Sequence, residues 1–261
     1  MFNPPKQQYK STSKCKYSMG KSFLLVGGSS DIGLRLATML LDEGHGVTLL
    51  ARDAERVNHL VAMGAVLVQG DALDEETVQA AVATASEAGE NGLSGMAHLV
   101  GSIALRPPHA TKLEDFQSVL QTNLVSAFLA LKTAGKAMLK LGQGRMVFTS
   151  SVAGSYGLTN HEAIAAAKGG IEAMVRSAAS TYAGRGLRVN AVAPGLTETR
   201  LGATVLRSDA IREASVGMIP LKRINEPEEI AQSMHWLLTA APDNLTGQVI
   251  HLDGGMSALR G

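Results

Sequence analysis

A glycine-rich segment near the start of the chain has the composition of an anion-binding turn. It runs Gly27-Gly28-Ser29-Ser30-Asp31-Ile32-Gly33, between an apolar run of strand length and a segment of helical periodicity. Glycine lets a backbone approach a phosphate closely, and the amides at a helix N-terminus favour an anion. Purely structural turns favour glycine as well. The position between strand and helix therefore makes this segment a candidate pyrophosphate site.

Arg52 follows the next apolar run, which ends in Leu50-Ala51-Arg52-Asp53. Dinucleotide-binding proteins place an acid about 20 residues after the glycine-rich turn, where it binds the ribose hydroxyls of NAD. Ala51 occupies that position here, and an arginine beside it suits the 2′-phosphate of NADP. Asp53 comes two residues late and favours capping of the next helix. Arg52 could also be an ordinary surface arginine, but we expect NADP(H) rather than NAD.

Strand-length apolar runs alternate with helix-length segments from residue 22 onward. The predicted strands are Phe23–Gly27, Gly46–Ala51, Ala65–Gly70, Met96–Gly101, Arg145–Ser150, Leu187–Ala193 and Gly247–Leu252. The predicted helices are Asp31–Glu43, Ala54–Met63, Glu75–Glu87, Leu113–Leu141, Thr159–Ala183 and Glu228–Thr239. Continuously apolar strands are expected where helices cover both faces of a parallel sheet. We predict an α/β fold, a doubly wound and mostly parallel seven-stranded Rossmann-type sheet.

No linker or internal repeat divides residues 21–261, so we expect a single domain there. Residues 1–20 contain no acid and lack the apolar centre of a secretory signal. They could be a tag, an extension upstream of a start at Met19, or an organelle transit peptide. We expect a cytoplasmic protein, or an organellar one if this extension is native.

Composition excludes several classes of function. The net charge of +1 gives no electrostatic footprint for nucleic acid or acidic membranes. No apolar run approaches the roughly 20 residues that span a bilayer. The seven histidines are scattered and the single cysteine, Cys15, precedes the domain. We therefore expect no metal site, no nucleic acid and no membrane among the partners.

Several motifs together resemble the short-chain dehydrogenase/reductase family over about residues 22–256. Val26 to Gly33 resembles the family's TGxxxGxG turn, with Asp31 in place of the middle glycine. The other matches are Gly70-Asp71-Ala72, Gln121-Thr122-Asn123-Leu124, the strand 145–154, Arg188 to Gly195 with Thr199, 219–231, and the ending 246–255. The resemblance implies a nicotinamide-dependent oxidoreductase, usually a dimer or tetramer.

The resemblance also implies roles for individual residues. Ser151, Lys168 and Asn123 match the catalytic serine, lysine and asparagine, and Asp71 matches the adenine-contacting aspartate. The residues implied to bind the cofactor are Gly27, Ser29, Ser30, Ile32, Gly33, Arg52, Asp71, Ala72, Gly101, Lys168, Pro194, Gly195 and Thr199.

The chain departs from the family where the catalytic tyrosine is expected. The family's YxxxK signature is replaced by Ile164-Ala165-Ala166-Ala167-Lys168, so the lysine is present and the tyrosine is isoleucine. Leu99 to Ala104 resembles the LVHSIA-type run of enoyl-carrier-protein reductases, a divergent branch in which the tyrosine stands seven residues before the lysine. In this chain that position is His161.

His161 is therefore a candidate for proton transfer or substrate polarisation. Thr159-Asn160-His161-Glu162 predicts a capping box, with Thr159 at the N-cap and His161 in the first helical turn. Positions 161, 164 and 168 would then share one helix face. A surface histidine that merely begins a helix is an equally weighted interpretation. Tyr156, in a loop after Ser151, is a second and weaker candidate.

Three functions remain open. The first is an NADP(H)-dependent oxidoreductase acting on a carbonyl, alcohol or enone small molecule with an altered proton donor. The second is a lyase or isomerase without redox chemistry on the same scaffold, and the third a catalytically impaired nucleotide-binding sensor or partner protein. Residues 198–223 are expected to form a lid over a partly hydrophobic substrate. We expect a homo-oligomer, a tetramer or a dimer, formed through the two long helices and the last strand.

Overall fold

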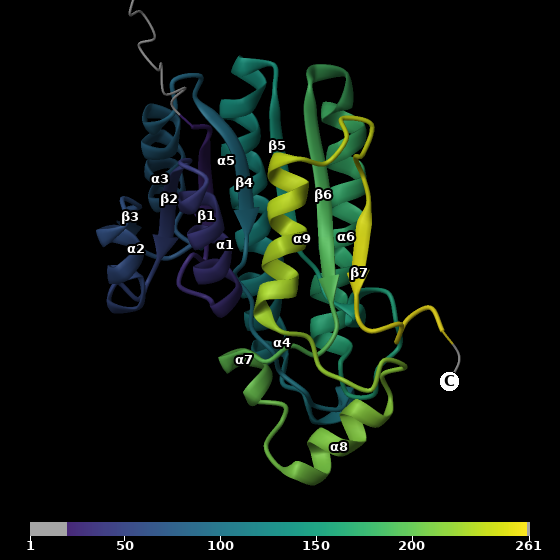
Figure 1. Cartoon of the computed structure of the whole chain (residues 1–261). Coiled ribbons are helices and arrows are strands. Elements are labelled where there is room, and N and C mark those ends of the chain that lie inside the picture. Colours follow the sequence, from purple (N-terminus) through teal and green to yellow (C-terminus); the bar gives the residue numbers. More distant parts are fainter. Residues whose placement is uncertain (1–19, 260–261) are drawn as a thin grey trace, which may run out of the picture.

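Seven parallel strands form one sheet in the computed structural model, which describes residues 20–259 (Figure 1). The strand order is β3-β2-β1-β4-β5-β6-β7. The strands are β1 (Ser22–Val26), β2 (Gly46–Ala51), β3 (Val66–Gln69), β4 (Leu93–His98), β5 (Gly144–Thr149), β6 (Leu187–Pro194) and β7 (Val249–Leu252). The predicted doubly wound sheet is confirmed. Its order reverses between β1 and β4, and ligands of such sheets bind at this point, beyond the carboxyl ends of the strands.

Helices cover both faces of the sheet. One face carries α3 (Glu75–Ala88), α5 (Ser126–Leu141) and α6 (Glu162–Tyr182). The other carries α1 (Asp31–Asp42), α2 (Asn58–Ala62) and α9 (Pro227–Thr239). Strand β1 shows why its sequence is continuously apolar: Leu24 and Val26 belong to the first core, and Phe23 and Leu25 to the second. Short 3₁₀ turns complete the fold at Glu55–Val57, Pro108–Ala110, Val152–Gly154 and Ala183–Arg185.

Strand β4 lies earlier in the chain than predicted. It spans Leu93–His98 instead of Met96–Gly101 and pairs with both β1 and β5. The sequence signal is weak because the strand contains Gly95. A Cβ at Gly95 would lie 2.7 Å from the ring of Phe23, so close packing requires the glycine. As a consequence Leu99 and the residues after it form a loop at the end of the sheet.

The predicted helix Leu113–Leu141 is interrupted. The structure has α4 (Leu113–Leu120), a π-helical turn at Gln121–Val125, and then α5. The side-chain amide nitrogen of Asn123, in this turn, donates to the backbone carbonyl of Val119 in α4 at 2.9 Å. Isolated π turns inside helices frequently occur at functional sites, and periodicity alone does not reveal them.

Helix α6 begins at Glu162, and the predicted capping box at Thr159 is wrong. His161 is the N-cap residue, and its side chain makes no capping hydrogen bond. Asn160 adopts φ of +64°, a left-handed conformation that separates Thr159 from the helix. His161 therefore precedes the first helical turn.

The segment 198–223 lies beyond the carboxyl ends of the strands, as expected for a lid. It contains α7 (Arg200–Ala203) and α8 (Asp209–Gly217), which Figure 1 shows at the lower end of the molecule with α4. Within residues 20–259, no helix is long and apolar enough to cross a membrane, and no group of three or more His, Cys, Asp or Glu residues could hold a metal ion. The predicted extension, except for Gly20, lies outside the described residues.

Candidate active site

A cavity of about 620 Å³ opens at the carboxyl ends of the strands. This volume lies in the range of about 300–1,000 Å³ typical of small-molecule sites. The predicted site residues that line it are Gly27, Ser29, Ser30, Ile32, Arg52, Asp71, Ala72, Gly101, Asn123, Ser151, His161, Lys168, Pro194, Gly195 and Thr199. Gly33 is the exception. It supports the turn from behind, where a Cβ would lie 2.8 Å from the carbonyl oxygen of Gly28.

The glycine-rich turn has the geometry of a phosphate cradle. Gly27 adopts φ of +87°, and a Cβ there would lie 2.9 Å from the backbone nitrogen of Val100. Ser30 caps α1 by accepting from the amide of Gly33 at 3.0 Å. The first helical bond runs from Leu34 to Ser30. The amides of Asp31 and Ile32 precede that bond, so they are oriented to bind an anion.

Asp31 turns its carboxylate away from this cradle. It accepts from the guanidinium of Arg56 at 2.8 Å and from the backbone amide of Arg200 at 2.8 Å. A carboxylate at this position would repel a pyrophosphate unless it turned away to bond backbone amides, and the structure shows such a bond. The positive charge of Arg56 balances the carboxylate, so the departure from glycine is compatible with an anion on the turn.

Arg52 and Asp71 face each other across one end of the cavity. Their ion pair measures 3.7 Å, and the Arg52 side chain is 78% exposed. An exposed pair at this distance contributes little to stability, so Arg52 can exchange this contact for another anion. Asp71 also accepts from the amide of Leu73 at 2.9 Å, which fixes its loop.

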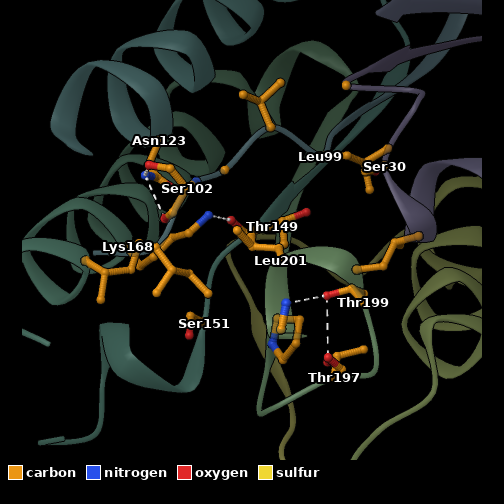
Figure 2. A pocket seen from close by; sticks show the side chains of 18 of the residues that line it. Ser30, Leu99, Ser102, Asn123, Thr149, Ser151, Lys168, Thr197, Thr199 and Leu201 are labelled. Carbon is orange, nitrogen blue, oxygen red and sulfur yellow. Dashed lines mark hydrogen bonds between the residues drawn. The ribbon is translucent and has the colours of Figure 1, made fainter. Parts of the chain in front are cut away.

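Lys168 and Asn123 form a buried polar centre in the middle of the cavity (Figure 2). The ammonium of Lys168 donates to the carbonyl oxygen of Thr149 at 2.8 Å. Burial lowers the pKa of Lys168 to about 8. Asn123 holds the loop after β4, since its oxygen accepts from the amide of Ser102 at 3.2 Å and its nitrogen donates to the Ser102 hydroxyl at 3.0 Å.

Gly101 lies against this centre. A Cβ at this position would lie 3.1 Å from the amide oxygen of Asn123 and 3.6 Å from the ammonium of Lys168. An added Cβ would crowd the Asn123 oxygen and would be in ordinary van der Waals contact with the ammonium. The lack of a side chain at position 101 lets the loop after β4 pass close to both groups.

His98 lies behind the centre and was not singled out from the sequence. Ser126 donates its hydroxyl proton to the Thr122 carbonyl at 2.6 Å, so its oxygen accepts from Nε2 of His98 at 2.9 Å. Burial first, and the charge of Lys168 second, lower the pKa of His98 to about 3. His98 is therefore a neutral neighbour of the lysine.

Sequence reasoning also missed the partners Ser102 and Thr149. Thr149 ends β5 and Ser102 follows β4, at the edge of the sheet where the cavity opens. Their positions at or after strand ends are the sequence signal that could have identified them.

The other end of the cavity is apolar. Ile164 is 3% exposed, and it packs in a small cluster with Val119, Ala153, Ala163 and Ala167. Ile103, Leu158, Leu201, Val205 and Met218 continue this wall. Ser151 accepts from the amide of Ala153 at 3.2 Å, so its hydroxyl hydrogen remains free to point into the cavity.

His161 lines the same cavity as Ile164 and Lys168, as the predicted spacing requires. Its Nδ1 lies 2.8 Å from the carbonyl oxygen of Thr159. A carbonyl only accepts, so Nδ1 carries the hydrogen, and in the neutral ring Nε2 is the unprotonated nitrogen. Tyr156, the weaker candidate, is 42% exposed and does not line the cavity.

The sequence of this chain is similar to those of known oxidoreductases over almost its whole length. The family model described as Enoyl-(Acyl carrier protein) reductase matches residues 27–257. The chain is 36% identical to carbonyl reductase family member 4 of Danio rerio, over 92% of this chain and 100% of that protein. It is 34% identical to 2-(S)-hydroxypropyl-CoM dehydrogenase 3 of Xanthobacter autotrophicus, over 90% and 96% respectively.

Solved structures show the same fold. The structure of ElxO with NADP bound superposes with a TM-score of 0.85 at 25% identity, covering 92% of this chain and 100% of that one. The sheet order, the glycine-rich turn and the matched chain length lead to one conclusion. This chain belongs to the short-chain dehydrogenase/reductase family of oxidoreductases.

Proposed function

We propose that this protein is an NADP(H)-dependent oxidoreductase acting on a carbonyl, alcohol or enone small molecule, with His161 in proton transfer in place of the missing tyrosine. The observation that carries the proposal is the buried centre of Lys168 and Asn123 beside an intact phosphate cradle. Burial of an ammonium is costly, and buried groups with strongly shifted pKa values cluster at functional sites. Its retention beside Ser151 favours a working site.

The residues of the cavity fit a dinucleotide. The amides of Asp31 and Ile32 would bind the pyrophosphate, Arg52 the 2′-phosphate, and Asp71 the adenine. Lys168 would bind the ribose next to the nicotinamide, on the side closed by Pro194, Gly195 and Thr199. When bound, the nicotinamide supplies or accepts a hydride.

His161 would transfer the proton to or from the substrate oxygen, and Ser151 would hydrogen-bond to that oxygen. The bond from Nδ1 of His161 to the Thr159 carbonyl leaves Nε2 as the reactive nitrogen. In the neutral ring Nε2 accepts the proton of an alcohol during oxidation, and in the imidazolium it donates a proton to a carbonyl during reduction. The Ser151 hydroxyl would donate a hydrogen bond to the same oxygen. The wall around Ile164 favours a substrate that is apolar beyond its reacting group.

One observation favours a second candidate function, a nucleotide-binding protein without turnover. Ile164 provides no hydroxyl where the family has one, and loss of a positioned proton donor typically costs about 10²–10⁴-fold in rate. A nucleotide-binding protein without turnover would have this site as well. A lyase or isomerase would instead form its product without added cofactor.

The first test is calorimetric titration of NADPH, with NADH in parallel, into the protein. We expect NADPH to bind more tightly, and binding of neither would reject the oxidoreductase proposal. A carbonyl and enone panel then monitors NADPH oxidation. On the substrate found, His161→Gln should lower kcat by about 10²-fold, and unchanged turnover would remove His161 from the mechanism.

We further propose a cytoplasmic homo-oligomer, a tetramer or dimer built on α5 and α6. Phe128 on α5 is 52% exposed, and Ala166 on α6 is exposed, whereas Ala163 and Ala167 pack within this chain. Exposed large apolar side chains beside small ones allow close helix contact between subunits. Light scattering that gives the mass of one chain would reject the oligomer.

A further inference from the structure

Asp31 connects two parts of the cavity that lie far apart in the sequence. Asp31 is the first residue of α1 and belongs to the phosphate-binding turn. One of its carboxylate oxygens accepts a hydrogen bond from the backbone amide of Arg200 at 2.8 Å. Arg200 is the first residue of α7, 169 positions later in the chain. The family motif has glycine at position 31, which has no side chain to make this bond.

The second carboxylate oxygen is also bonded, so the side chain is held from both sides. Arg56 donates to it at 2.8 Å, and the side chains of Arg56 and Asp31 are only 20% and 25% exposed. Nε of Arg200 lies 4.0 Å away and adds a weaker charge contact. Hydrogen bonds to a charged group are stronger than neutral ones, more so when water is partly excluded.

The bonded end of α7 carries the residues that cover the substrate end of the cavity. Thr199 caps α7 by accepting from the amide of Gly202 at 2.9 Å. Leu201 and Val205 follow, and both line the cavity (Figure 2 shows Leu201 and Thr199). Arg212 and Glu198 form an ion pair that ties α8 back to the same end. A contact at Arg200 therefore fixes where the apolar lid begins.

We propose that Asp31 is a positioning residue that anchors the lid, residues 198–223, on the phosphate-binding turn. The proposal rests on the proposed function for its kinetic consequence, because the anchored lid forms the substrate wall. Asp31 acts through Arg200 and touches no reacting atom. Its loss should therefore weaken substrate binding more than NADPH binding.

The kinetic test compares Asp31→Gly with Asp31→Asn. Glycine restores the family motif and removes both bonds, whereas the asparagine oxygen can still accept from the amide of Arg200. We expect Asp31→Gly to raise KM for the substrate about tenfold. The change in the Kd of NADPH should be smaller, because the backbone amide at position 31 is kept. Asp31→Asn should recover most of the lost affinity. An unchanged KM in Asp31→Gly, or equal KM values for the two variants, would overturn the proposal.

A second test needs no turnover. Arg207 and Arg212 are exposed in the lid, so trypsin can cleave there whenever the lid opens. Cleavage followed by mass spectrometry should be several-fold faster in Asp31→Gly than in the parent, with Asp31→Asn in between. The control is Arg35→Gln, which breaks an exposed ion pair between α1 and Glu228 of α9.

The experiments can reject the lid anchor and the oxidoreductase function independently of each other. Equal cleavage rates in the three proteins would reject the anchor even if NADPH binds. Faster cleavage in Asp31→Gly would support the anchor even if no cofactor binds and the oxidoreductase proposal is rejected. Unfolding midpoints of the variants, measured in parallel, identify any general loss of stability, and accelerated cleavage outside residues 198–223 would count against the anchor.

Discussion

The two ends of the cavity are built from different chemistry. The cofactor end consists of backbone amides, glycines that permit close approach, and the buried pair of Lys168 and Asn123. The proposed substrate end is an apolar wall around Ile164, with His161 and Ser151 as the proposed reactive side chains. The cofactor end keeps most of the family pattern but has Asp31 in place of a glycine, whereas the substrate end departs from it at the position of the family's tyrosine.

This difference indicates that nucleotide binding and proton transfer are separable in this fold. The phosphate cradle depends on backbone conformation at the end of β1, and the proposed ribose contacts depend on Lys168. Neither requires a hydroxyl at position 164. Changes in the phosphate cradle should therefore alter cofactor binding, and changes at Ile164 or His161 should alter turnover. Changes at Lys168, in the middle of the cavity, should alter both.

The largest expected effect is at Lys168, in the middle of the cavity. Lys168→Met should lower kcat by about 10³-fold because the positioned charge is lost. The unfolding midpoint should not fall, since the variant removes a buried ammonium that folding has to desolvate. Steady-state kinetics and thermal unfolding measure the two quantities. Retained turnover would show that Lys168 serves structure alone.

The next largest effect is expected on kcat, from a substitution at the substrate end. Ile164→Tyr should raise kcat by about 10²-fold, because it returns a hydroxyl donor to the position facing Lys168 in the family pattern. Ile164→Phe adds nearly the same volume without the hydroxyl and should give no gain. Equal effects of the two substitutions would mean that volume, rather than proton transfer, limits the rate.

A smaller effect is expected on the preference for NADPH over NADH. Arg52→Gln should weaken NADPH binding about tenfold by removing a charge-assisted contact with the 2′-phosphate. NADH binding should not change. Parallel calorimetric titrations give both values, and Arg35→Gln is the matched control because that exposed arginine does not line the cavity. A similar loss for both nucleotides would remove Arg52 from cofactor selection.

The smallest effect is on pH dependence. Since the pKa of Lys168 is about 8, its positive charge is present at pH 7 and is lost as the pH rises to 9. The 2′-phosphate, with a pKa near about 6, does not titrate in this window. NADPH affinity should therefore fall several-fold from pH 7 to 9, and Lys168→Met should show a flat profile. A similar fall in that variant would assign the titration elsewhere.

The expectations drawn from the sequence succeeded where local pattern and chain order were sufficient. Strand β2 has the predicted bounds, and the residues expected around the cavity lie around it, except Gly33. The reason is general: parallel strands end at one edge, so motifs at successive strand ends must meet there. The bounds of β4, the start of α6 and the π turn at Asn123 were missed because tertiary contacts decide them.

The sequence by itself determined the doubly wound sheet, the phosphate turn, and the replacement of tyrosine by Ile164. Each follows from periodicity or from a residue type at a fixed position. Only the tertiary structure decided where Asp31 turns and which loop meets Lys168. Those outcomes depend on single hydrogen bonds between segments distant in the chain, such as Asp31 to Arg200. Such bonds have no local pattern, because their partners come together only when the sheet is complete.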